Sequence, residues 1–259
     1  MIDIHTHILP GVDDGPDSME VSLKIVRAAR EQGITKMVAT PHYLEEGYQL
    51  TPEETGERVA KLQEAVDEAG VKVEILPGAE AYLTADLGKR VQDGLVTPIN
   101  HSRYILVEFP MTYVPAYVNN VFYDLKIMGY TPIICHPERY SPIREKPDYL
   151  YEWLQDGILA QVNASSLLGV YGSRVRKAAE ILVRNNLVQL IASDAHSTGR
   201  RKVNLKAGVS KLKGIVGNYA ENYLKNAENV ITDTELDYAE PIRYEKSSGL
   251  LKRVRKFIW

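Results

Sequence analysis

The chain has one cysteine, no long apolar run and almost no excess of either charge. The single cysteine, Cys135, excludes an internal disulfide, which is typical of proteins from a reducing compartment. No run approaches the roughly 20 apolar residues that span a bilayer. A cleaved signal peptide is not expected, because it would remove candidate ligands near the N-terminus. A net charge of −3 gives no reason to expect nucleic acid as a partner. We therefore expect a cytoplasmic protein.

Helical segments alternate with short apolar segments along most of the chain. Glycine follows four of the helical segments shortly before an apolar run, where it supplies the left-handed conformation that turns the chain back: Gly33, Gly70, Gly129 and Gly157. Asp17 or Ser18 can cap one helix, and Thr51-Pro52-Glu53-Glu54 is a capping box for another. A hydrophobic fraction of 44% is enough for a full core.

Seven apolar runs are strand candidates: residues 2–5, 36–40, 73–76, 104–108, 132–135, 159–162 and 188–193. Nearly continuous apolar strands separated by helices favour a parallel sheet that is buried on both faces. Alternation over this length predicts an α/β barrel or a doubly wound sheet. The candidate ligands follow strand ends, and functional residues collect at that face of a barrel. We therefore expect one (β/α) barrel domain over residues 1–244, followed by a tail over residues 245–259.

Five of the six histidines end an apolar run or follow one within three residues: His5, His7, His42, His136 and His196. A single histidine at such a place is more often a core or rim residue than a ligand. Four acids are placed in the same way: Asp14, Glu80, Glu108 and Asp194. Taken singly, each acid is also compatible with an ion pair or a helix cap, and residues 13–15 with a simple turn. Together these side chains predict a polynuclear metal site at the C-terminal ends of the strands.

The candidate ligands also indicate how many ions the site holds and of which kind. Nine ligands are too many for one ion, and they suit three ions when a carboxylate bridges two of them. Imidazole and carboxylate ligands without a thiolate are typical of Mn, Fe or Zn. Cys135 precedes His136 along a strand, and neighbouring strand residues point to opposite faces. We therefore expect the thiol of Cys135 to point away from the site.

Arg139 follows His136 by three residues and is a candidate for the same site. A guanidinium offers a planar, bidentate grip on a phosphate group. The alternative is a rim arginine paired with Glu138 or Glu145. Arg200 and Arg201, just after the last histidine motif, are further candidates.

The ordered motifs around these residues resemble the polymerase-and-histidinol-phosphatase (PHP) superfamily: His5-x-His7, Asp13-Asp14-Gly15, Thr40-Pro41-His42, Pro77-Gly78-x-Glu80, Glu108-Phe109-Pro110, His136-Pro137-Glu138-Arg139 and Ser193-Asp194-Ala195-His196. More closely, they are similar to its bacterial manganese-dependent protein-tyrosine phosphatases of capsule and exopolysaccharide loci. The resemblance runs from residue 1 to about residue 235. It implies the PHP fold, a distorted seven-stranded (β/α) barrel with a trinuclear manganese site.

The resemblance also implies a role for each candidate residue. One ion would take His5, His7, Glu80 and Asp194; a second would take Glu80 as a bridge, Glu108 and His136; the third would take Asp14, His42 and His196. Arg139 matches the family's phosphate-binding arginine, and Arg201 matches the arginine after the last motif. In the family that arginine is usually followed by prolines, whereas Lys202 and Val203 follow here, which puts the role of Arg201 in doubt.

The candidate ligands predict hydrolysis of a phosphate monoester by a metal-bridged hydroxide, and the resemblance implies that the ester is phosphotyrosine. The thiol route is excluded, because a Cys-x5-Arg loop from Cys135 would need arginine where Ser141 stands. The family resemblance implies a partner as well: a bacterial tyrosine autokinase with a tyrosine-rich C-terminal tail, which controls capsular or exopolysaccharide synthesis.

Three alternatives stay open at this point. A histidinol-phosphate phosphatase has the same fold and chemistry on an alkyl ester. A metal-dependent nuclease or polymerase proofreading module would need a basic excess or an attached polymerase, and the chain has neither. A non-catalytic, metal-stabilised module could instead bind a kinase tail. Residues 250–259 interleave four cations with apolar residues, so they either dock weakly on an acidic partner or an anionic membrane, or form a packed terminal segment.

Overall fold

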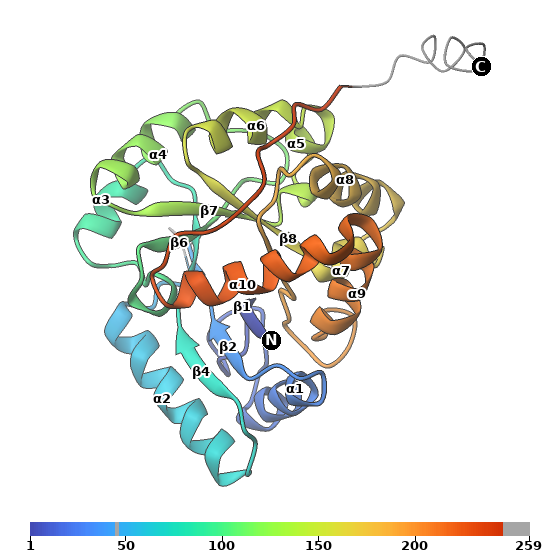
Figure 1. Cartoon of the computed structure of the whole chain (residues 1–259). Helices are drawn as coiled ribbons and strands as arrows, with labels where there is room; N and C mark the ends of the chain where they lie inside the picture. Colours follow the sequence, from blue (N-terminus) through green and yellow to red (C-terminus); the bar gives the residue numbers. More distant parts are fainter. Residues whose placement is uncertain (45–46, 246–259) are drawn as a thin grey trace.

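The computed structural model describes residues 1–44 and 47–245 and has an α/β fold with parallel sheets. The predicted docking segment, residues 250–259, lies outside this part of the chain. No helix within the described ranges is long and apolar enough to cross a membrane. Figure 1 shows the strands near the middle of the molecule, with helices around them.

The described residues form nine strands in two sheets, and every strand pair is parallel. The three-stranded sheet has the order β1 (Ile2–Thr6), β2 (Lys36–Ala39) and β4 (Glu74–Pro77). The six-stranded sheet has the order β3 (His42–Tyr43), β5 (Glu80–Tyr82), β6 (Tyr104–Glu108), β7 (Thr131–Cys135), β8 (Leu159–Asn163) and β9 (Leu190–Ala192).

All seven predicted runs contain a strand, and the short strands β3 and β5 are additional. Each of these two follows a longer strand after a break of two residues, so β2 leads into β3 and β4 into β5. At the second break, a Cβ atom on Gly78 would lie 2.8 Å from Cγ1 of Val38, closer than packed side chains approach one another. At each break the chain passes from the three-stranded sheet to the six-stranded sheet.

The first and last strands meet at their C-terminal ends. Thr6 forms an isolated parallel bridge with Ala195. The amide of His7 donates to the carbonyl of Ala195 at 2.8 Å, and the amide of Asp194 donates to the carbonyl of His5 at 3.0 Å. These bonds bring residues from opposite ends of the chain to one edge, where the candidate ligands lie.

Ten α-helices and three short 3-10 helices connect or cover the strands in the described part of the chain. The α-helices are α1 (Met19–Glu31), α2 (Pro52–Glu68), α3 (Leu87–Gln92), α4 (Val118–Ile127), α5 (Ser141–Glu145), α6 (Asp148–Gln155), α7 (Ala164–Leu167), α8 (Ser173–Arg184), α9 (Leu205–Val216) and α10 (Ala220–Ile231). The 3-10 helices are η1 (Ile99–His101), η2 (Pro137–Arg139) and η3 (Gly217–Tyr219).

The local signals in the sequence are largely confirmed. The four predicted glycines all have positive φ, and Thr51 and Glu54 form the expected reciprocal capping box. The helix predicted after Ser18 begins at Met19, so its position is confirmed. The predicted cap by Ser18 is wrong, because the Ser18 side chain makes no capping hydrogen bond.

The core has two parts, which follow from the two faces of the strands. The larger cluster lies between the strands and the surrounding helices. The smaller cluster joins inward side chains of β1, β2, β4, β6, β7, β8 and β9 to Ala227, Val230 and Ile231 of α10. Helix α10 packs on β1 and β9 (Figure 1). The candidate ligands lie at the C-terminal ends of these strands.

Candidate metal centre

The nine predicted ligands gather at the C-terminal ends of the strands. His5 lies in β1 and His7 just after it, Asp14 in the loop before α1, His42 in β3, Glu80 in β5, Glu108 at the end of β6, His136 after β7, and Asp194 and His196 after β9. Asp14 is exposed, and the other eight are buried or partly buried. Such a concentration of buried imidazoles and carboxylates is costly unless the groups are paired or bind a cation.

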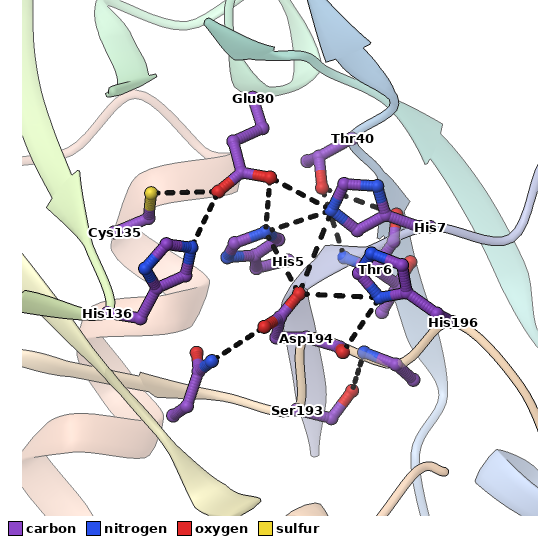
Figure 2. Close-up of polar contacts among 12 residues, drawn as sticks. His5, Thr6, His7, Thr40, Glu80, Cys135, His136, Ser193, Asp194 and His196 are labelled. Atoms are coloured by element: carbon purple, nitrogen blue, oxygen red, sulfur yellow. Dashed lines mark hydrogen bonds and ion pairs between the residues drawn. The ribbon is translucent and has the colours of Figure 1, made fainter. Parts of the chain in front are cut away.

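Glu80 is the centre of the first group (Figure 2). Its carboxylate is 1% exposed, and its Oε2 atom lies 3.3 Å from Nε2 of His5 and 3.0 Å from Nε2 of His7. Its Oε1 atom lies 2.8 Å from Nε2 of His136. The two oxygens therefore face different imidazoles, as a carboxylate between two ions would.

Asp14 is the centre of the second group. Its Oδ1 atom lies 3.0 Å from Nε2 of His196 and 3.4 Å from Nε2 of His42. Nδ1 of His42 lies 3.2 Å from Glu80 and 3.5 Å from Glu108. His42 thus connects the two groups. Glu80 and Glu108 both contact Nδ1 of its ring, so these two carboxylates lie close to each other.

The hydrogen bonds of three imidazoles fix which ring nitrogen can bind a cation. Nδ1 meets an acceptor in each case: Oε1 of Gln161 at 2.9 Å for His5, Oδ2 of Asp13 at 2.6 Å for His7, and the carbonyl of Asp194 at 3.0 Å for His196. In the neutral ring, Nε2 is left with a lone pair. At Nε2 each ring faces a carboxylate oxygen at 3.0–3.3 Å, a contact that holds only with a proton or a metal ion between the two atoms. The donor set therefore fits metal ions.

The pKa values of His7 and Glu108 also show that the buried carboxylates of the site favour a positive charge beside them. Burial lowers the pKa of His7, but the hydrogen bond and charge of Asp13, together with Glu80, outweigh burial and raise it to about 10. Burial, and then the charge of Glu80, raises the pKa of Glu108 to about 7. Burial, and then the charge of His7, lowers the pKa of His196 to about 4, which keeps this ring neutral, as a ligand must be.

Arg139 and Arg201 lie at the same site. Nη1 of Arg139 lies 3.2 Å from Oδ2 of Asp194, and its guanidinium lies 5.0 Å from the centre of the Tyr171 ring. The alternative of a rim arginine paired with Glu138 or Glu145 is wrong, because within the described residues the ion-pair partner of Arg139 is Asp194, and Oε1 of Glu138 instead accepts from the amide of Asn163 at 3.0 Å. Arg139 therefore contributes its charge to the metal site.

Arg201 contacts both groups of candidate ligands. It lies 2.8 Å from Asp14 and 3.2 Å from Asp194. Arg200 points elsewhere and donates to the carbonyl of Val170. Sequence analysis proposed both Arg200 and Arg201 as candidates. Of these two, Arg201 contacts the candidate ligands and Arg200 does not.

The expected position of Cys135 is wrong. Its Sγ atom lies 2.9 Å from Oε1 of Glu80, the same atom that His136 contacts. His136 has the left-handed conformation with φ 35°, so the alternation of the strand ends before it. Burial, and then the charge of Glu80, raises the pKa of the Cys135 thiol well above its usual range. The thiol therefore stays protonated and donates a hydrogen bond to the carboxylate.

Three polar residues that support the ligands were missed by sequence analysis. Asp13 orients His7, and Gln161 orients His5. Gln161 donates to Asn163 at 2.9 Å, and Asn163 donates to Asp194 at 2.7 Å. A signal for the last two was present, because Gln161 and Asn163 are two apart in an otherwise apolar strand and so share one face.

The model of the family described as "Capsular polysaccharide synthesis, CpsB/CapC" matches residues 1–232. CapC of Staphylococcus aureus is 37% identical over 256 residues, which are 97% of this chain and 100% of the relative. The tyrosine-protein phosphatase YwqE of Bacillus subtilis is 33% identical over 96% of this chain and 99% of its own length.

A solved structure supports the same relationship. It belongs to crystal structures of YwqE from Bacillus subtilis and CpsB from Streptococcus pneumoniae, which are described as unique metal-dependent tyrosine phosphatases. The TM-score is 0.92 with 33% sequence identity, and the match covers 95% of this chain and 100% of that chain. On the matched length and these similarities, the chain belongs to the CpsB/CapC family of capsular polysaccharide synthesis.

Proposed function

We propose that this protein is a metal-dependent protein-tyrosine phosphatase. The observation that carries the proposal is the gathering of imidazoles and carboxylates around Glu80, with Arg139 and Arg201 beside them. Fixed cations next to a metal cluster suit a substrate that brings a dianionic phosphoryl group. Relatives that are named tyrosine-protein phosphatases support this choice of substrate.

The proposed site holds three ions, with manganese as the first candidate and iron or zinc as alternatives. By the family resemblance, His5, His7, Glu80 and Asp194 would hold one ion, Glu80, Glu108 and His136 a second, and Asp14, His42 and His196 the third. Three groups of neighbouring ligand atoms support parts of these sets: His5, His7 and Glu80; Glu80 and His136 with Cys135; and Asp14, His42 and His196 with His7. Glu108 lies with His42 and Glu80 in a fourth group. Bound ions of this kind lower the pKa of water towards neutrality and neutralise phosphoryl oxygens.

The residues of the chain have distinct roles in this proposal. Arg139 holds the phosphoryl oxygens with a planar pair of N–H donors, and Arg201 adds a second permanent positive charge. Gln161 and Asp13 keep the imidazoles of His5 and His7 in the orientation that exposes Nε2. Cys135 is not the nucleophile, because its buried thiol stays protonated.

A tyrosyl ester suits this set of residues. The phenolate leaving group has a conjugate acid with pKa about 10, so it departs with less help from a general acid than an alkoxide does. The proposed substrate is the tyrosine-rich tail of a bacterial autokinase that regulates capsular or exopolysaccharide synthesis. The cytoplasmic location expected from the sequence stays a prediction.

The fold proposal is that both sheets form one distorted seven-stranded barrel within a domain of residues 1–244. Two features support it: the bridge between Thr6 and Ala195, and the inner cluster that joins side chains from seven strands. In this barrel, β2 with β3 and β4 with β5 each count as one interrupted strand.

A competition assay tests the proposed function. Purified protein, first stripped of metal and then loaded with Mn²⁺, is given a phosphotyrosine peptide and histidinol phosphate together. We expect turnover only after loading, with a higher kcat/KM for the peptide. Glu80→Ala is the control for contaminating phosphatase and should show no turnover. Faster hydrolysis of histidinol phosphate would favour the alkyl-ester alternative, and verified metal binding without turnover of either ester would favour a binding module.

A further inference from the structure

A basic groove lies next to the metal centre but contributes no ligand to it. Its volume is about 590 Å³, and its lining includes Arg144 from α5, Arg174 and Lys177 from α8, and Tyr244 from the last described segment. Glu145 is the single carboxylate in this lining, so three cations face one anion. The groove therefore carries net positive charge.

The two cations of α8 are available for a ligand. Arg174 and Lys177 are exposed, and neither forms an ion pair with any other residue in the described ranges. In contrast, Arg176 and Lys211 each pair with Glu180, at 3.4 Å and 3.3 Å. Unpaired cations that line a hollow, unlike scattered surface cations, create a local potential that attracts anions.

The groove is connected to the phosphate-binding arginine through two short links. Arg144 donates hydrogen bonds to the carbonyls of Glu138 and Arg139. Tyr171, which lies under the guanidinium of Arg139, comes two residues before α8 begins. Both α5 and α8 pack on η2, which carries Arg139. The groove and Arg139 are therefore built on elements that contact one another directly.

The last described segment forms one side of the groove and is held firmly. Arg243 lies 3.3 Å from Asp148 and 4.6 Å from the centre of the Tyr151 ring. The amide of Ile242 donates to the carbonyl of Asn185 at 2.8 Å. Figure 1 shows this segment passing α6 and α5, and Asp148 and Tyr151 both belong to α6. These contacts attach the side of the groove that carries Tyr244 to α6 and to the end of α8.

We propose that this groove binds an acidic segment next to the phosphotyrosine of the substrate, with Arg174 and Lys177 contacting its anionic side chains. The inference rests on the proposed phosphatase function and adds a second recognition site to it. Either carboxylates or a second phosphate group offers the required negative charge. Binding there lowers KM, and it leaves kcat unchanged because the groove does not touch the scissile bond.

The test uses Mn²⁺-loaded protein and peptides of equal length that contain one phosphotyrosine. Three peptides carry neutral flanks, glutamates on the N-terminal side, or glutamates on the C-terminal side; a fourth carries a second phosphotyrosine. Two exposed ion pairs, each contributing about 0.2–1 kcal/mol, together favour binding by about 2- to 30-fold. We expect the better acidic peptide to show a kcat/KM higher by this factor, through KM, and the preference to shrink at high salt. The fourth peptide separates phosphate from carboxylate as the preferred anion.

The variant R174Q/K177Q should remove this preference and leave hydrolysis of the neutral peptide unchanged. R176Q/K211Q is the matched control, because it removes two cations of the same region that already pair with Glu180. Equal kcat/KM for acidic and neutral peptides, or a preference that persists in R174Q/K177Q, would overturn the inference alone. No hydrolysis of any phosphotyrosine peptide would overturn the proposed function and the inference with it.

Discussion

Replacing Arg139 is the sharpest test of how the site binds phosphate. Its side chain is 22% exposed, lies over Tyr171 and reaches Asp194, so it meets a substrate in a partly dry environment. A charge-assisted bidentate contact in such a place contributes on the order of 2–4 kcal/mol. Each 1.36 kcal/mol is about tenfold in rate, so Arg139→Ala should lower kcat/KM on a phosphotyrosine peptide by roughly 30- to 1,000-fold.

The same substitution should leave bound metal unchanged. Asp194 keeps its contacts with Asn163 at 2.7 Å and with Arg201 at 3.2 Å when Arg139 is removed. Arg139→Lys should recover only part of the loss, because an ammonium keeps the charge but not the planar fork. Arg200→Ala is the matched control, since that arginine lies nearby but bonds only a carbonyl of the loop before α8.

The assay is steady-state kinetics on the three variants and the wild type, with elemental analysis of each preparation. Wild-type kcat/KM in Arg139→Ala would refute phosphate binding by this residue. A loss of metal that parallels the loss of activity would refute the separation of roles and would make Arg139 a support for Asp194.

Three further predictions concern the metal site. Glu80→Ala and Asp194→Ala should each lose bound metal and most activity with an unchanged circular dichroism spectrum; metal content equal to the wild type in both would contradict the ligand assignment. Cys135→Ser should keep near-normal turnover, because a hydroxyl can still donate to Glu80, whereas a chelator should abolish turnover; a trapped phosphocysteine would show the opposite mechanism. Asp13→Asn should weaken metal affinity by about 10- to 100-fold through His7, measured by titration of the stripped protein, and unaltered affinity would exclude this role.

The gathering of the candidate ligands could be predicted because parallel strands share an edge. Each apolar run ends where the strand leaves the core, and a histidine or acid at that point must lie at the common C-terminal end. His5, Glu108 and Asp194 are more than eighty residues apart in sequence, yet one rule places all three. Applying this rule requires only the positions at which the strands end, and the side-chain contacts do not have to be known.

The short strands β3 and β5 could not be predicted, because they contain too few residues to show the alternation of apolar and polar side chains that marks a strand. His42–Tyr43 and Glu80–Tyr82 are two and three residues long, which is below the length at which alternation is visible. Their existence depends on the break before each of them, and the second break depends on the absence of a side chain at Gly78 next to Val38. That contact joins residues that are forty positions apart, so local sequence does not reveal it.

The error at Cys135 has a related cause and indicates how the site is formed. His136 and Asp194, with φ 35° and 55°, are non-glycine residues in the left-handed region, which costs about 1 kcal/mol or more for each. Glycine would remove that cost but would also remove the imidazole or carboxylate. His136 directly follows β7, and Asp194 comes two residues after the end of β9, where the turn directs the side chain to the other candidate ligands. Local conformational preference and the chemistry of the candidate site conflict at these two positions. At His136 the turn ends the strand alternation, so the orientation that alternation predicted for Cys135 is wrong.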